Sequence, residues 1–181
     1  MFLTFMADGF EEVEAIATID VIRRSGIEVT TVSVGDSAAV TGAHGIAVIC
    51  DKVIADVAPS EALDGIILPG GMPGTLNLLK NDRVNEFIDY CHASGRMLCA
   101  ICAAPMILGK KGLLKGKKAL CFPGFEDDLI GAELGSGLVC TDGDIITARG
   151  MGCAVDFGLA IVARVKGKPA ADALKATLQC P

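Results

Sequence analysis

The feature that most constrains the fold is the alternation of short apolar runs with helix-like segments along the chain. Strand-like runs are Met1–Met6, Ile27–Val34, Gly65–Leu68 and Arg96–Ile101, and then Lys118–Cys121, Leu138–Cys140 and Asp144–Thr147. Helices are predicted over Phe10–Ser25 and Arg83–Ser94, and near Ala154–Val165 and Pro169–Leu178. This rhythm predicts an α/β fold with a mostly parallel sheet and helices on both faces. The glycine-punctuated segment Asp36–Cys50 predicts a hairpin arm outside the alternation.

Length and composition limit the class of protein. A chain of 181 residues suits a single domain over 1–181. Hydrophobic residues make up 51% of it and charged residues 21%, which excludes a disordered chain, and the apolar runs are too short to cross a bilayer. The net charge of -6 argues against a nucleic-acid partner. We therefore expect a compact protein that binds neither nucleic acid nor membrane.

The eight cysteines lack the regular spacing of a disulfide scaffold. We therefore expect a reducing compartment, the cytoplasm, and the start of the chain does not resemble a secretory signal. Cys99 and Cys102 form a CxxC, but no second ligand pair accompanies it for a metal. Cys99 also lies inside an apolar strand run, which disfavours a redox dithiol pair.

Parallel sheets bind ligands beyond the carboxyl ends of their strands. The loops Ala7–Phe10, Pro69–Gly74 and Ile101–Pro105 are expected at that edge. The second loop is rich in glycine and matches no phosphate-binding motif. Its backbone N–H groups suit either an oxyanion hole or a plain tight turn.

Acidic residues begin the first predicted helix. For Glu11 and Glu12, interaction with the helix dipole is a sufficient explanation. Glu14 differs because its neighbours Val13, Ile16 and Ala17 are apolar, so position 14 is expected near the face that turns toward the sheet. Burial there would favour the protonated carboxyl.

Cys102 stands where a buried strand turns into a helix, flanked by small residues. This placement resembles a nucleophile elbow, and a helix start favours thiolate over thiol. The alternative is a buried core cysteine, since free cysteines are commonly buried.

Five segments together resemble the ThiJ/PfpI superfamily, in the branch of the parkinsonism-associated deglycase (DJ-one) and the bacterial YajL protein. They are ADGFEEVEAIATIDVIRRSG, ILPGGMPG, AICAAP, FPGFEDDL and TARGMGCAVDFGLAI. The resemblance implies a flavodoxin-like three-layer sandwich with Cys102 as nucleophile and Glu14 as the protonated carboxyl beside it. It also implies an oxyanion cradle from the N–H groups of Gly70, Gly71 and Ala103. A homodimer with the first helix and the Asp36–Cys50 arm at its interface is expected as well.

The sequence departs from the family pattern at several positions. Peptidase-like members have histidine after the nucleophile, where this chain has Ala103, and Phe122 stands where a relative has histidine near the cysteine. His44 replaces an arginine that reaches toward the partner subunit, and Met151 replaces a proline that lines the pocket. These three side chains are candidates for the pocket or the interface. His92 is expected on the surface of its helix.

The resemblance implies a cofactor-free, metal-free glyoxalase or deglycase acting on small carbonyl substrates, such as methylglyoxal or its adducts. Cys102 would form a hemithioacetal and Glu14 would move protons, with thiolate and neutral acid as the favoured state of the pair. A redox-sensing chaperone that uses oxidation of Cys102 is the alternative. A cysteine peptidase or amidase is disfavoured by the missing histidine.

Overall fold

The computed structural model describes residues 1–180, and a seven-stranded sheet runs through its centre. The strand order is β10-β11-β7-β6-β1-β2-β5. The strands are β1 (Phe2–Met6), β2 (Val29–Ser33), β5 (Lys52–Val53), β6 (Gly65–Leu68), β7 (Met97–Ile101), β10 (Val139–Asp142) and β11 (Ile145–Ala148). Every neighbouring pair is parallel except β10 and β11. The predicted mostly parallel sheet is confirmed.

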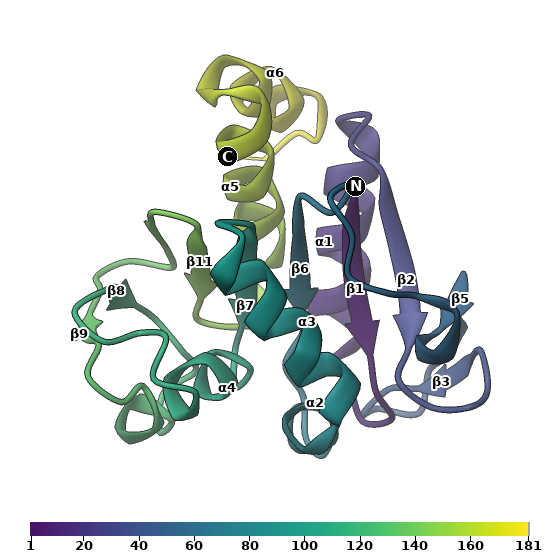
Figure 1. Ribbon diagram of the computed structural model, residues 1–181. Helices are drawn as coiled ribbons and strands as arrows, with labels where there is room; N and C mark the ends of the chain where they lie inside the picture. Colours follow the sequence, from purple (N-terminus) through teal and green to yellow (C-terminus); the bar gives the residue numbers. More distant parts are fainter. Residues whose placement is uncertain (181) are drawn as a thin grey trace.

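Helices cover both faces of this sheet, as Figure 1 shows. Helices α1 (Glu12–Arg24) and α5 (Ala154–Lys166) lie on one face, and α6 (Lys168–Thr177) packs on α5. Helices α2 (Gly74–Lys80), α3 (Asp82–Ala93) and α4 (Pro105–Lys110) lie on the other. The expected three-layer α/β sandwich is confirmed.

The central strands are buried on both faces, which explains why they read as continuous apolar runs rather than as alternating ones. Two apolar cores result, one on each side of the sheet. In the core under α3, the rings of Phe5 and Phe87 lie 5.0 Å apart between centroids. Burial of these runs fixes the sheet and therefore the loops at its edge.

The hairpin arm is present, with β3 (Ala39–Thr41) antiparallel to β4 (Ala47–Ile49). The run Lys118–Cys121 was expected to be a strand of the main sheet, and this prediction is wrong. Only β8 (Lys118–Ala119) forms within it, and β8 pairs with β9 (Glu133–Leu134) in a separate small sheet. The run does not join the main sheet, and the Leu120 N–H donates to the Thr147 side-chain oxygen at 2.9 Å.

Three short 3-10 turns complete the elements, at Ile54–Asp56, Glu126–Asp128 and Met151–Cys153. Across residues 1–180, none of the helices is both long and apolar enough to span a bilayer.

Candidate active site

Cys102 follows β7 directly and precedes α4. Its φ is 64°, a left-handed conformation that is unusual for a residue other than glycine. Two backbone hydrogen bonds hold it there: its N–H donates to the Ala148 carbonyl at 2.9 Å, and its carbonyl accepts from the Phe122 N–H at 2.8 Å. Strained backbone that neighbouring structure over-determines is common at active sites. Cys102 is thus partly exposed at a strained turn between a strand and a helix, and its role as the nucleophile stays a prediction.

Gly70 lies in the loop that follows β6, which ends at Leu68, and it packs against this elbow. A Cβ atom at position 70 would lie 2.5 Å from the Cys102 Cβ, 2.6 Å from Glu14 Oε2 and 3.1 Å from the Cys102 Sγ. No side chain fits into that space, so glycine is required here by close approach. The same distances show that the carboxyl and the thiol meet on one side of Gly70.

Glu14 lies in the first turn of α1 and is only 1% exposed. Its Oε2 accepts the Gly70 N–H at 2.9 Å. The predicted burial is confirmed, but the reason given for it is wrong, because Val13 and Ile16 are 47% and 45% exposed. The contacts of the Glu14 carboxyl come instead from the glycine loop at Gly70 and from the segment at Gly150 and Met151.

Burial raises the pKa of the Glu14 carboxyl to about 7. Hydrogen bonds from Cys102 and from the backbone N–H groups of Gly70 and Met151 partly oppose this rise, while the charge of Glu11 adds to it. A carboxyl that titrates near neutral pH can both accept and return a proton.

Burial also raises the pKa of the Cys102 thiol, to about 12, and the charge and hydrogen bonding of Glu14 add to the rise. The backbone N–H groups of Ala103 and Gly71 act in the opposite direction. Both shifts arise from burial and from the contact between the two groups, and the expected pairing of a thiolate with a neutral carboxylic acid stays a prediction. The two groups share a proton, and loss of it from sulfur requires Glu14 to take it up.

The three expected cradle residues divide into two roles. The N–H groups of Gly71 and Ala103 face the sulfur. The Gly70 N–H instead donates a hydrogen bond to the Glu14 carboxyl. The structure thus brings Cys102, Glu14 and all three backbone segments together, with Gly70 orienting the carboxyl.

His44 lies on the arm and contacts Glu12, not Cys102. The carboxylate of Glu12 accepts the His44 backbone N–H at 2.7 Å and lies 2.9 Å from its ring Nδ1. Glu12 is 5% exposed, so the helix-dipole explanation was insufficient for it. The sequence feature that belongs to this contact is Gly42, because a Cβ atom at position 42 would overlap the Glu12 side chain. The contact with Glu12 raises the pKa of His44. Burial acts to raise the pKa of Glu12, but the hydrogen bonds from His44 outweigh it and lower that pKa.

Phe122 and Met151 border the site, with 47% and 53% of their surface exposed. His92 is exposed on α3, as expected. With His44 bound to Glu12, neither histidine of the chain pairs with Cys102.

One group of side chains has the donor atoms of a metal site. Atoms of Glu11, Glu12 and His44 lie within 4.8 Å of one another. However, Glu12 already binds the arm, and Glu11 caps α1 by accepting the Glu14 N–H at 2.7 Å. These hydrogen bonds give the group a structural role.

Comparison with known proteins identifies the family of the chain. Residues 2–164 match the model of the DJ-1/PfpI family. The chain is 37% identical over 176 residues to DJ-1 homolog A of Arabidopsis thaliana, which covers 96% of this chain but only 45% of that protein. It thus spans less than half the length of this relative. A Pyrococcus abyssi protein named as a deglycase is 33% identical over 150 residues, 81% of this chain and 88% of its own.

Among solved structures, oxidized Toxoplasma gondii DJ-1 superposes with a TM-score of 0.94 and 35% identity. The match covers 99% of this chain and 97% of that one. The family model spans most of the sequence, and the fold agrees over nearly all of it. The chain therefore belongs to the DJ-1/PfpI family.

Proposed function

We propose that the protein is a cofactor-free glyoxalase or deglycase that acts on 2-oxoaldehydes such as methylglyoxal, or on their adducts with thiols and amines. The observation that carries the proposal is the placement of the Glu14 carboxyl and the Cys102 thiol against one face of Gly70. A nucleophile next to a group that titrates near pH 7 is the arrangement that covalent and acid–base catalysis need. The Pyrococcus abyssi relative is named as a deglycase, which supports this class of reaction.

In the first step, Glu14 takes the thiol proton as sulfur attacks the aldehyde carbon, and a carbon–sulfur bond forms. The N–H groups of Gly71 and Ala103, which lie beside the sulfur, stabilise the oxygen that becomes negative. Glu14 then gives this proton to the oxygen, which completes the hemithioacetal and restores the carboxylate. The protein uses only its own residues for this step.

In the second step, Glu14 removes the proton from C1 and returns it to C2. The hydroxyl proton passes from the C1 oxygen to the C2 oxygen, so C1 is oxidised to a thioester, the C2 ketone is reduced to a hydroxyl, and no external oxidant or reductant is needed. Water then hydrolyses the thioester, which releases a 2-hydroxy acid and restores the thiol. With methylglyoxal the product is lactate, and its formation without added glutathione tests the proposal.

A redox-sensing chaperone is the second candidate. Cys102 is partly exposed, as are Cys140 and Cys180, whereas Cys50, Cys91, Cys99, Cys121 and Cys153 are buried. The Toxoplasma gondii structure is of an oxidized form. All eight cysteines are free thiols, which suits a reducing compartment such as the cytoplasm. Peptide mapping after mild peroxide treatment tests this candidate, which requires Cys102 to be oxidised first.

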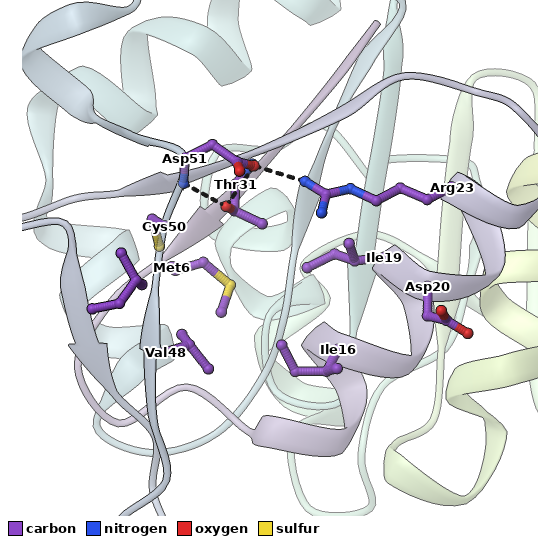
Figure 2. Close-up of a pocket in the computed structure, with 10 residues that line it drawn as sticks. Met6, Ile16, Ile19, Asp20, Arg23, Thr31, Val48, Cys50 and Asp51 are labelled. Atoms are coloured by element: carbon purple, nitrogen blue, oxygen red, sulfur yellow. Dashed lines mark hydrogen bonds and ion pairs between the residues drawn. The ribbon is translucent and has the colours of Figure 1, made fainter.

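We also propose that the protein forms a homodimer through α1 and the arm. Val13, Ile16, Ile46 and Ile49 expose between 45% and 76% of their surface. Figure 2 shows Ile16 and Ile19 of α1 facing Val48 of the arm. These three side chains line a hollow of about 270 Å³. Exposed apolar side chains gathered on two adjacent elements are typical of a protein–protein interface.

A further inference from the structure

An open groove of about 400 Å³ lies beside the Cys102 elbow. Its walls include Phe122, Leu138, Arg149 and Met151, with Gly150 between the last two. The side chains of Phe122, Leu138 and Met151 are 47%, 54% and 53% exposed. The structure therefore presents an apolar surface to solvent next to the proposed catalytic pair.

Gly150 joins this groove to the pair. A Cβ atom at position 150 would lie 3.2 Å from the Phe122 ring and 3.8 Å from Glu14 Oε1. The Phe122 N–H also donates to the carbonyl of Cys102 at 2.8 Å. A small molecule bonded to Cys102 could thus extend its substituent over Gly150 into the groove.

The side chains around the groove are of kinds that attract aromatic rings. The ring of Phe122 suits stacked or edge-to-face packing, and the thioether of Met151 suits a sulfur–aromatic contact. The guanidinium of Arg149, also in the wall of the groove, is suited to a cation–π contact with the face of a bound aromatic ring. A methyl group would contact little of this surface, whereas an aryl group would cover much of it.

We propose that this groove binds the aryl substituent of an aryl 2-oxoaldehyde and makes such compounds better substrates than methylglyoxal. The inference rests on the proposed function, because it names the substrate class of the same site. Phenylglyoxal is the simplest member of this class. Its conversion to mandelate adds one water, oxidises the aldehyde carbon to a carboxylate and reduces the ketone to a hydroxyl, as in the steps above.

The first test compares kcat/KM for phenylglyoxal and methylglyoxal in the wild type. Burial of roughly half of an aryl group predicts a ratio of about ten in favour of phenylglyoxal. That ratio is expected to fall about fivefold in Phe122→Ala and in Met151→Ala. It is expected to stay at the wild-type value in Leu134→Ala, since Leu134 is 61% exposed on β9 and does not border the groove.

The second test does not depend on turnover. Calorimetry of mandelate and lactate with the wild type is expected to give a Kd about tenfold lower for mandelate, and Met151→Ala is expected to lose this difference. Equal Kd values, or a substrate ratio near one that the variants leave unchanged, overturn the groove inference while leaving the proposed function standing. Preferential mandelate binding without turnover of either aldehyde supports the groove and refutes the proposed function.

Discussion

The Gly70 N–H donates to Glu14 Oε2 at 2.9 Å, and this bond orients the carboxyl toward the Cys102 sulfur. Position 70 has no room for a side chain, since a Cβ there would overlap both Glu14 and Cys102. Gly70 is thus the point through which β6 aligns the two proposed catalytic groups.

Gly70→Ala is therefore expected to lower turnover by about 10²-fold, because misplacement of reacting groups by about 1 Å costs that much. Overpacking is expected to lower the free energy of unfolding by about 1–3 kcal/mol. Gly35→Ala is the matched control, since the nearest atom to a Cβ there is 3.8 Å away. Turnover assays and thermal melts check both effects, and near-normal turnover in Gly70→Ala would contradict the alignment role.

The raised pKa of Glu14 predicts how stability depends on pH. Between about 4.5 and 7, folded Glu14 keeps a proton that the unfolded chain releases, so the free energy of unfolding falls as pH rises. The fall is on the order of 3 kcal/mol. Urea melts at several pH values are expected to show this component in the wild type and in Glu133→Gln, an exposed control, but not in Glu14→Gln. A curve for Glu14→Gln that parallels the wild type would refute the raised pKa.

The Glu12 carboxylate is expected to hold the arm in place. Glu12→Ala leaves the His44 N–H without its acceptor and is expected to destabilise the protein by about 1–3 kcal/mol. His44→Ala removes only an exposed ring and is expected to cost less. Chemical denaturation compares the two, and a larger loss in His44→Ala would show that the ring, rather than the backbone contact, anchors the arm.

If the protein is a homodimer through α1 and the arm, a charged side chain introduced on that surface is expected to separate the subunits. Ile49 is 76% exposed on β4, so Ile49→Glu is expected to leave the fold intact and give a monomer in sedimentation velocity. Ile130→Glu, at a 57% exposed position far along the chain, serves as the control and is expected to stay dimeric. A wild type that sediments as a monomer would refute the interface.

Much of the fold could be predicted from the sequence because β1, β6 and β7 are buried on both faces and therefore read as unbroken apolar runs. The small sheet of β8 and β9 could not, because each has only two residues and carries no periodicity. β5 at the sheet edge, Lys52–Val53, is equally short.

Within the site, the place of Cys102 between a strand and a helix could be predicted, because an apolar run ends directly before it. The role of Glu12 could not, because its partner lies 32 residues away on the arm. The closeness of the two groups could not be predicted either, because the Gly70 loop that brings Glu14 beside the sulfur comes from another part of the chain.

The central claim is tested most directly by lactate formation from methylglyoxal without glutathione. The wild type and Cys140→Ser, which changes a partly buried cysteine on β10, are expected to form lactate at similar rates. Cys102→Ser is expected to form none above background, and Glu14→Gln to be slower by about 10²-fold or more. Lactate formation by Cys102→Ser at the wild-type rate would contradict the account.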